Sequence, residues 1–186
     1  MRKETGKKSQ GEEIIKSARV KSGEEQAPKK EENKTLIVYM TKGGATGEAA
    51  NVIADVLRDK FSWQVDLVDL RKQPKPNVTE YRNVVVGGGV RAGKLYKEAV
   101  EFVKQDLNGK RVAFFICSGA AGDALHHDEV AEKYITKGLA NTLNVKLVAM
   151  EAFGGCIRIL GKVVTDRRDP AKVQAWAEEL GKKLSE

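Results

Sequence analysis

Five short apolar runs alternate along the chain with segments whose apolar residues recur at helical spacing. The runs are Leu36–Met40, Val65–Leu70, Val84–Val86, Val112–Cys117 and Val145–Phe153. Because they are almost continuously apolar, these runs are typical of strands that are covered on both faces. Strands that alternate with helices form a parallel sheet, and right-handed crossovers place helices on both of its faces. The sequence therefore predicts an α/β fold with a three-layer, doubly wound, five-stranded parallel sheet.

Helical patterns fill the segments between these runs. The expected helices cover Ala50–Leu57, Leu95–Leu107, His127–Asn141 and a C-terminal stretch that starts at Pro170. Proline suits the first turn of a helix, and Asp169 before it is a typical cap. Residues 155–169 are expected to form a short, basic connection into this last helix.

The first 33 residues differ from the rest of the chain. They are rich in Lys, Glu, Gln, Ser and Gly and contain no aromatic residue. A segment of this kind buries too little apolar surface to offset the entropy that ordering would cost. We expect a disordered tail over residues 1–33 and one domain over residues 34–186.

Charge and composition limit the class of protein. The net charge is +7, but basic and acidic residues are interleaved, so we expect no nucleic-acid partner. No stretch approaches the roughly 20 apolar residues that span a bilayer, and no secretory signal is recognisable. A cytoplasmic protein without integral membrane association is expected. Cys117 and Cys156 have no CxxC spacing and are expected to be buried free thiols.

A glycine-rich loop, Thr41–Gly47, joins the first run directly to a helix. Its glycines let several backbone N–H groups point at one spot, its threonines add hydroxyl donors, and the helix dipole favours an anion there. The loop is therefore a candidate phosphate cradle. The alternative is a glycine-rich turn that is capped by Thr46.

A second glycine-rich segment follows the third run and invites two nucleotide-binding interpretations. Gly88-x-x-x-x-Gly93-Lys94 is close to the phosphate-binding loop of P-loop nucleoside triphosphatases, but Leu95 stands where a Mg²⁺-binding hydroxyl is required. Gly87-x-Gly89-x-x-Ala92 fits a loose dinucleotide fingerprint, but the next run does not end in an acidic residue for the ribose. Both interpretations are disfavoured.

Several motifs in order resemble those of flavodoxins. Thr41-x-x-Gly44-x-Thr46 is similar to the loop that binds the FMN phosphate, with Gly43 where flavodoxins usually carry a third hydroxyl residue. The branch that includes the quinone-dependent protoporphyrinogen oxidases tolerates this change. Gly88–Gly93, Phe153-Gly154-Gly155 and the segment from Asp169 to Trp176-Ala177 also resemble that branch. The resemblance extends over about residues 35–184.

This resemblance implies a flavodoxin-like strand order of 2-1-3-4-5 and an FMN cofactor. It implies that loop Thr41–Thr46 holds the phosphate, and that loops Gly88–Tyr96 and Ser118–Asp123 lie on either side of the isoalloxazine ring. The cofactor-binding residues expected from it are Thr41, Lys42, Gly43, Gly44, Ala45, Thr46, Gly88, Gly89, Val90, Arg91, Ala92, Gly93, Tyr96, Ser118, Gly119, Gly122 and Asp123.

Some side chains near these loops have two interpretations. Tyr96 either stacks near the flavin ring or points into the core. Arg91 and Lys94 either raise the flavin potential by stabilising its reduced anion or are solvated charges. His126 and His127 fit a helix start with Asp caps, and one of them is also a candidate proton donor at the flavin edge.

Three functions follow from this pattern. The first is an FMN-binding electron carrier that serves redox partner proteins and needs no catalytic acid or nucleophile of its own. The second is an FMN-dependent oxidoreductase of the protoporphyrinogen oxidase or quinone reductase type. The short connection over residues 155–169 favours the carrier, because those oxidases carry a long insertion there. The third is a flavin-free binding module. The sequence leaves the oligomeric state open.

Overall fold

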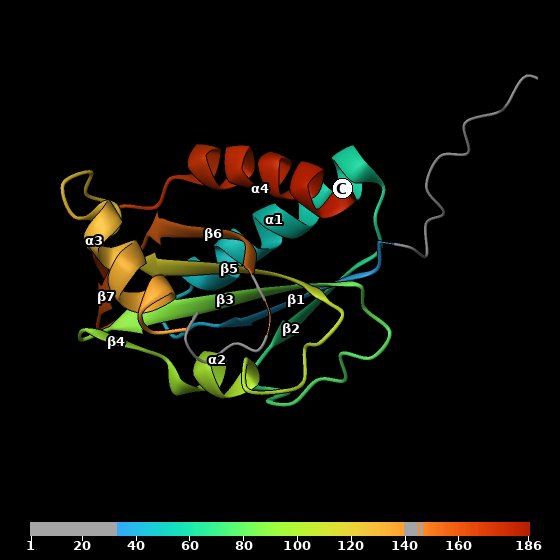
Figure 1. Cartoon of the computed structure of the whole chain (residues 1–186). Helices are drawn as coiled ribbons and strands as arrows, with labels where there is room; N and C mark the ends of the chain where they lie inside the picture. The colour runs from blue at the N-terminus through green and yellow to red at the C-terminus, as the bar shows by residue number, and fades with distance from the viewer. Residues whose placement is uncertain (1–32, 140–144, 146) are drawn as a thin grey trace, which may run out of the picture.

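A computed structural model of the chain describes residues 33–139, 145 and 147–186. Its centre is a parallel sheet in the order β2-β1-β3-β5-β6 (Figure 1). The strands are β1 (Thr35–Met40), β2 (Val65–Asp69), β3 (Asn83–Arg91), β5 (Arg111–Ser118) and β6 (Leu147–Gly154). Counted in chain order, this is the predicted order 2-1-3-4-5. The predicted tail lies outside the described residues except for Asn33, whose carbonyl accepts a hydrogen bond from Thr35 Oγ1 at 3.0 Å.

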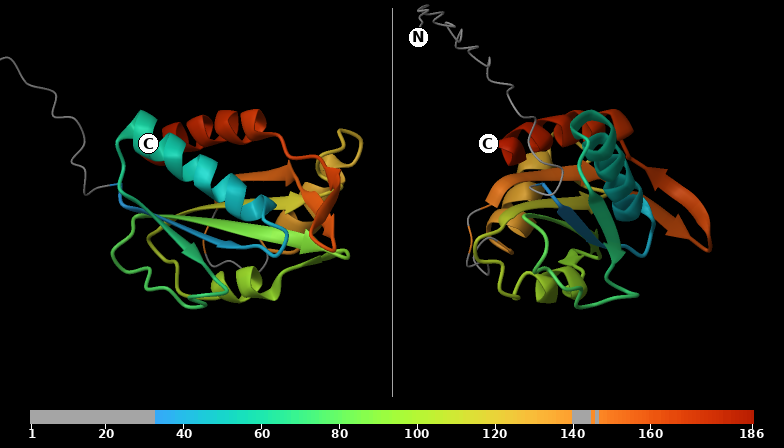
Figure 2. Two further views of the ribbon diagram at one scale, coloured as in Figure 1. Left: turned by 180° about the vertical axis from the view of Figure 1, so that it is seen from behind. Right: turned by 90° about the vertical axis from the view of Figure 1, so that its right-hand side faces the viewer.

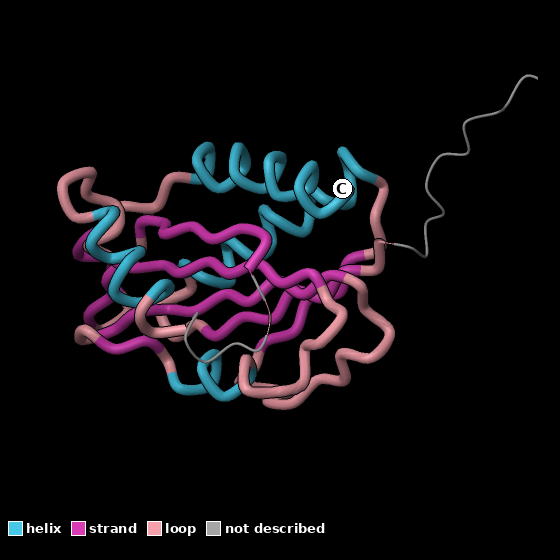
Figure 3. The backbone as a smooth tube through the Cα atoms, in the orientation of Figure 1, coloured by secondary structure: helices cyan, strands magenta, loops and turns pink. Residues whose placement is uncertain are grey.

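Helices cover both faces of the sheet and give the three predicted layers. Helices α1 (Ala45–Phe61) and α4 (Pro170–Ser185) lie together on one face (Figures 1 and 2). The other face is covered by α2 (Lys97–Phe102), by α3 (His127–Ala131) and by the π-helical turn η1 (Glu132–Thr136). The loops gather at the two ends of the sheet (Figure 3). At one of these ends lie the carboxyl ends of the parallel strands.

The alternation of side chains along each strand explains the continuous apolar runs. Ile37, Val85 and Ala113 are paired neighbours on β1, β3 and β5 and pack under α1 and α4. Their chain neighbours, such as Val84 and Val86, pack against the helices of the other face. Both faces of the central strands are therefore buried, and both must be apolar.

The N-terminal start of α4 follows the sequence prediction closely. Pro170 is its first residue, and the Asp169 carboxylate accepts a hydrogen bond from the backbone N–H of Lys172 at 3.0 Å. This bond satisfies one of the free N–H groups at the helix start. The predicted cap is confirmed.

The segment after β3 differs from the predicted loop and helix. Strand β3 runs on to Arg91 and turns back into β4 (Lys94–Leu95), so this segment is a β-hairpin. Its turn residues, Ala92 and Gly93, have φ values of 48° and 72°, as a tight two-residue hairpin requires. Helix α2 begins only at Lys97, two residues after the predicted start.

The segment before α4 also differs from the prediction. The expected short connection contains strands β7 (Cys156–Ile159) and β8 (Lys162–Asp166), which pair antiparallel. At its tip, Leu160 and Gly161 both have positive φ values, 49° and 78°. This β7–β8 hairpin projects beyond the main sheet (Figure 2, right). Short apolar runs with cations between them concealed the strands in the sequence.

Within the described residues, the third predicted helix is shorter and less regular than expected. It begins at His127 as predicted, but after Ala131 it continues as the π-helical turn η1. The end of the prediction, at residues 140 and 141, lies outside the described residues. The described chain has no helix that is both long and apolar enough to cross a membrane.

Candidate functional site

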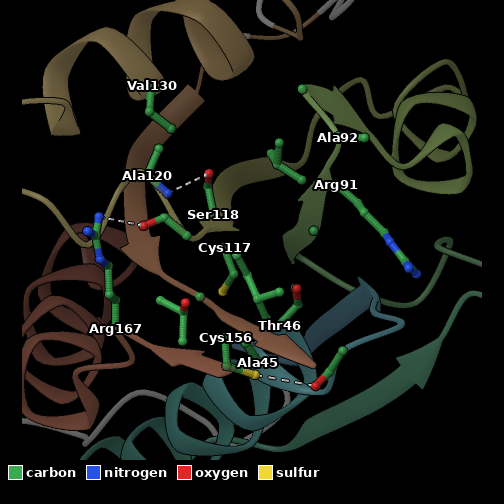
Figure 4. Close-up of a pocket in the computed structure, with 18 of the residues that line it drawn as sticks. Ala45, Thr46, Arg91, Ala92, Cys117, Ser118, Ala120, Val130, Cys156 and Arg167 are labelled. Carbon is green, nitrogen blue, oxygen red and sulfur yellow. Dashed lines mark hydrogen bonds between the residues drawn. The ribbon is translucent and has the colours of Figure 1, made fainter. Parts of the chain in front are cut away.

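A pocket of about 810 Å³ opens at the carboxyl ends of β1, β3 and β5. In an open parallel sheet this edge is where ligands bind, because the loops after neighbouring strands converge there. Figure 4 shows Thr46, Ser118 and Cys156 on segments that meet around this pocket. The pocket therefore brings together three loops that the sequence singled out, namely those after the first, third and fourth apolar runs.

The turn between β1 and α1 forms one wall of the pocket. The backbone N–H of Gly44 donates to Thr41 Oγ1 at 2.9 Å, and Gly44 adopts a φ of 96°. Thr41 and Thr46 are both buried. Gly44 is the cap residue of α1, and no side chain caps this end of the helix. The alternative in which Thr46 caps the turn is therefore wrong, and free N–H groups at the start of α1 face the pocket region.

The β7–β8 hairpin holds this turn from the other side. The carbonyl oxygen of Gly43 accepts a hydrogen bond from Arg158 Nε at 3.1 Å and a weaker one from Cys156 Sγ at 3.5 Å (Figure 4). At the far end of the hairpin, Arg168 binds Asp166 at 2.5 Å and also binds Glu48 in the first turn of α1. The hydrogen bonds from the side chain and backbone of Arg168 lower the pKa of Asp166 to about 2.

The β3–β4 hairpin forms the next wall and carries an aromatic ring. A Cβ at Gly89 would lie 2.7 Å from Tyr96 Cε2 and 3.1 Å from Thr46 Oγ1, so only glycine fits there. Tyr96 both lines the pocket and packs against the core of the α2 face. Lys42 Nζ lies 5.1 Å from the centre of its ring. The core contact of Tyr96 is confirmed, and its ring stands at the boundary between core and pocket; stacking near a flavin ring stays a prediction.

The loop after β5 closes the floor of the pocket. Ser118 Oγ accepts from the backbone N–H of Ala120 at 3.3 Å, and the Ser118 carbonyl accepts from the N–H of Gly155 at 2.9 Å. Arg167 Nη1 donates to the Gly119 carbonyl at 3.2 Å (Figure 4). A Cβ at Gly155 would lie 3.1 Å from the backbone of Ser118, so the chain after β6 packs directly on this loop.

The two cysteines both line the pocket, which the sequence did not indicate. Cys117 is buried at the end of β5, and burial raises the pKa of its thiol to about 12. Cys156 is only half-buried. Both cysteines are free thiols, as predicted, but only Cys117 is buried, because the β7–β8 hairpin turns Cys156 toward Gly43.

The two histidines point in different directions. His126 lines the pocket, with Nδ1 3.6 Å from Asp123 Oδ2. His127 instead bonds Glu151 Oε1 on β6 through Nε2 at 2.6 Å and Asp128 Oδ1 through Nδ1 at 2.9 Å. The hydrogen bond with Asp128 and that with Glu151 raise the pKa of His127. Asp side chains do not cap α3, so that interpretation is wrong.

Most of the predicted cofactor-binding residues line this pocket. Those that do are Thr41, Lys42, Gly43, Ala45, Thr46, Gly89, Val90, Arg91, Ala92, Gly93, Tyr96, Ser118 and Gly119. Gly44 lies at the start of α1, Gly88 lies beneath Leu95, and Gly122 lies against Arg167. The Asp123 carboxylate accepts from the backbone N–H of Leu125 at 3.1 Å. These four are not among the residues of the pocket wall.

Sequence reasoning missed the wall formed by α3, η1 and the β7–β8 hairpin. Glu129, Lys133 and Tyr134 line the pocket from the α3–η1 segment, and Ile157 and Ile159 line it from the hairpin. Tyr134 falls on the apolar stripe of its helix and packs partly against the core, but it also lines the pocket. The π-helical turn rotates the side chains relative to their positions in a regular α-helix. The spacing of apolar residues in the sequence therefore does not reveal the contact of Tyr134 with the pocket.

The pocket wall carries threonine hydroxyls and Lys42 where the β1–α1 turn lies, and elsewhere it combines glycine-rich segments with side chains such as Tyr134 and Ile157. Its volume lies within the range of about 300–1,000 Å³ that is usual for cofactor sites. Hydroxyls, free N–H groups and Lys42 gather at one end, and the glycines near Ser118 and Gly89 leave flat, uncovered peptide groups. These features fit a planar ligand with an anionic group at one end. No group of His, Cys, Asp or Glu side chains suited to a metal is found among the described residues.

The family comparison agrees with this geometry. The family model of the flavodoxin domain matches residues 36–168. The chain belongs to this family. Membership of this family makes the chain a flavoprotein. Its expected redox activity comes from the flavin cofactor that members of the family bind.

The curated relatives that this flavodoxin-domain protein matches all have the same name. Over 112 residues it is 30% identical to a protoporphyrinogen IX dehydrogenase [quinone] of Escherichia coli strain K12, and the match covers 59% of this chain and 61% of the relative. Over 85 residues it is 29% identical to a protein of the same name from Leishmania major, and that match covers 44% of this chain and 37% of the relative. The chain thus spans about three fifths or less of these relatives.

Solved structures share the fold. Flavodoxin 2 of Bacillus cereus matches with a TM-score of 0.55 at 23% identity, covering 81% of this chain and 99% of the flavodoxin. A short-chain flavodoxin associated with a bacterial microcompartment matches with a TM-score of 0.54 at 16% identity, covering 82% and 99%. The predicted flavodoxin-like fold is confirmed.

Proposed function

We propose that this flavodoxin-domain protein binds FMN and passes electrons to redox partner proteins. The observation that supports this most directly is the convergence of the β1–α1 turn, the β3–β4 hairpin and the Ser118–Gly119 loop on one pocket. The polar end of that pocket suits a phosphate, and its glycine-lined part suits the edge of a flat ring.

The phosphate end is assigned to Thr41–Thr46. The Thr46 hydroxyl, the free N–H groups at the start of α1 and the Lys42 ammonium supply donors and positive potential. Arg158 binds the Gly43 carbonyl and so fixes the peptide that would otherwise turn an oxygen toward the anion. FMN is proposed rather than FAD because FMN is the typical cofactor of the flavodoxin family, to which the chain belongs.

The ring end is assigned to the space between Gly89–Gly93 and Ser118–Gly119. When bound, FMN supplies the one- and two-electron chemistry that side chains of the protein lack. The protein binds and orients it: Tyr96 borders the ring, peptide groups next to glycines offer hydrogen bonds to ring heteroatoms, and His126 provides a titratable N–H at the mouth. The Arg91 cation adds positive potential at the same mouth.

The first experiment is cofactor retention. The purified full chain is mixed with excess FMN or FAD, gel-filtered and examined by its visible spectrum. We expect retained flavin absorption after FMN and little after FAD. Thr46→Val removes the hydroxyl but keeps the shape, and it is expected to weaken FMN binding by about 2–10-fold, the worth of a typical hydrogen bond. Thr136→Val, in η1, makes the same change away from the pocket and serves as the control. Failure to retain FMN contradicts the proposal.

A second candidate is an FMN-dependent oxidoreductase of the protoporphyrinogen oxidase or quinone reductase type. It is favoured by the name of the relatives and by the β7–β8 hairpin, which adds an apolar wall of Ile157 and Ile159 beside the pocket. The connection at residues 155–169 is as short as the sequence indicated, which favours the carrier, but it folds as the β7–β8 hairpin. Turnover of protoporphyrinogen with a quinone, compared with electron transfer to a protein acceptor, separates the two functions.

A further inference from the structure

The mouth of the pocket has a charge and an apolar ridge that together point to one kind of partner. We propose that this mouth is a docking surface for an acidic protein. The inference rests on the proposed function, because it names the class of redox partner that reaches the FMN site. Its components are the cations that line the pocket and the β7–β8 hairpin beside them.

Positive charge is concentrated at the mouth. Lys42, Arg91, Lys133, Arg158 and Arg167 line the pocket, and Glu129 is the single carboxylate among the described lining residues. Arg91 and Arg167 stand on opposite sides of the opening (Figure 4). Cations that surround an opening focus a positive potential there and raise the association rate of an anionic partner.

Within the described residues, four of these five charges have no ion pair, whereas Arg167 pairs with Asp123 Oδ2 at 3.6 Å. Lys42 and Lys133 lie over the rings of Tyr96 and Tyr134, at 5.1 and 5.2 Å from the ring centres. Within the described part of the chain, neither lysine nor Arg91 has a carboxylate at ion-pair distance, and Arg158 donates to a carbonyl. A carboxylate-rich surface would therefore meet four cations, Lys42, Arg91, Lys133 and Arg158, that have no ion-pair partner among the described residues.

The β7–β8 hairpin adds an apolar ridge. In the described residues, five of the seven exposed large apolar side chains lie on it: Ile157, Ile159, Leu160, Val163 and Val164. Leu160 at the tip is 98% exposed, and Ile159 is 58% exposed. Exposed apolar groups gathered in one place mark an interaction surface. Lys162 lies among them and extends the positive charge along the ridge.

The combination fits a protein better than a lipid surface. A protein interface has an apolar core with a polar rim, and complementary charge gives rate and orientation. A bilayer would be met by the tip of the hairpin, whereas the cations flank the pocket on both sides, beginning with Arg91 on the β3–β4 hairpin. A partner that covers the mouth contacts both sets and brings its redox centre near the pocket.

The test uses one acceptor in two charge forms. Native cytochrome c is basic, and succinylation of its lysines makes the same haem protein acidic. The FMN-loaded, reduced full chain is mixed with each form in a stopped-flow instrument at about 10 and about 150 mM salt, where the Debye length falls from about 30 to about 8 Å. We expect the rate constant for the succinylated form to fall at least about 10-fold, and that for the native form to stay level or rise.

Two matched double variants locate the effect. Lys133→Glu with Lys162→Glu reverses two charges at the mouth and on the ridge, and it should abolish the preference for the succinylated form. Lys75→Glu with Lys183→Glu makes the same change in net charge in the β2–β3 loop and in the last turn of α4, where both residues are exposed. This control should keep the preference. Equal effects of the two double variants would assign the attraction to net charge and overturn the docking surface.

Direct binding separates this proposal from the proposed function. Titration calorimetry measures binding of succinylated cytochrome c to the chain with and without FMN at low salt. One outcome is that the chain retains no FMN but still binds succinylated cytochrome c, and that the Lys133→Glu, Lys162→Glu variant loses this binding. This outcome refutes the proposed function and keeps the docking surface. FMN retention without such binding overturns the docking surface alone. A lipid contact would give a different pair of results. The chain would sediment with phosphatidylserine vesicles in a way that depends on Lys162, and it would show no preference for succinylated cytochrome c. That pair of results would also overturn the docking surface.

Discussion

Arg158 donates from Nε to the carbonyl oxygen of Gly43, across 3.1 Å and 115 residues of sequence. This bond joins the β7–β8 hairpin to the turn that precedes α1. The turn is the proposed phosphate end of the site. The hairpin carries Arg158, and Arg167 follows it directly; both cations line the pocket. The C-terminal part of the chain thus helps to fix the conformation of a loop near its start.

Removal of this bond should weaken FMN binding. Arg158→Met keeps most of the side-chain stem and removes the donor, so the Gly43 peptide gains freedom that binding must again restrict. We expect the Kd for FMN to rise by about 2–10-fold, in line with the loss of one hydrogen bond. Lys162→Met removes a cation from the same hairpin without touching Gly43. Fluorescence titration of FMN should show that this control binds as the parent does; equal losses would point to charge alone.

A methyl group at Gly89 should disturb the boundary between core and pocket. Gly89→Ala places a Cβ 2.7 Å from the Tyr96 ring and 3.1 Å from Thr46 Oγ1, so the ring must move. We expect a loss of about 1–3 kcal/mol in the free energy of unfolding, typical of overpacking. In Gly43→Ala the new Cβ meets only the Cys156 carbonyl at 3.5 Å, an ordinary contact. Denaturant unfolding compares the two, and an unchanged midpoint for Gly89→Ala would show that Tyr96 yields freely.

Stability should depend on pH through His127. Its pKa is raised by the hydrogen bond with Asp128 and by that with Glu151 on β6, while nearby Lys172 of α4 acts in the opposite direction. A group whose folded pKa is raised stabilises the fold below its unfolded pKa, and this contribution is lost as pH rises through the folded value. The free energy of unfolding should therefore be higher at about pH 6 than at about pH 8.5. His127→Gln should flatten this slope, whereas His126→Gln leaves the His127 contacts in place and should keep it.

Arg91 should tune the flavin potential, although weakly. Its side chain is exposed at the pocket mouth and extends away from Ser118 and Cys117 in Figure 4. Arg91→Ala should lower the two-electron midpoint potential of bound FMN by about 4–20 mV, the equivalent of the roughly 0.2–1 kcal/mol that an exposed charge contributes. Spectroelectrochemical titration measures the shift. A midpoint that does not move would remove Arg91 from this role.

The fold could be predicted because its strands are buried on both faces. Ile37 faces one layer of helices and Val38 faces the other, so the run around them is continuously apolar and easily recognised. The cap at Asp169 was equally clear, since a capping carboxylate and a proline act within a few residues of each other. Such local signals need no knowledge of the rest of the chain.

The walls contributed by distant segments could not be predicted in the same way. Cys156 and Arg158 act on Gly43 through contacts that span more than a hundred residues, and no local pattern encodes them. Tyr134 was hidden by the π-helical turn, which changes the register of its helix. For the β7–β8 hairpin a signal was present: Leu160-Gly161 between two β-branched, apolar segments is a hairpin-like turn.

The bond from Arg158 to Gly43 also sets when the pocket can exist during synthesis. Proteins are made from the N-terminus, and a nascent chain can fold its early segments first. A chain that has not yet reached Arg158 already contains the β1–α1 turn and all five parallel strands, the last of which ends at Gly154, but one wall of the cavity is still missing. Loading of a ligand at this site therefore follows the synthesis of the β7–β8 hairpin.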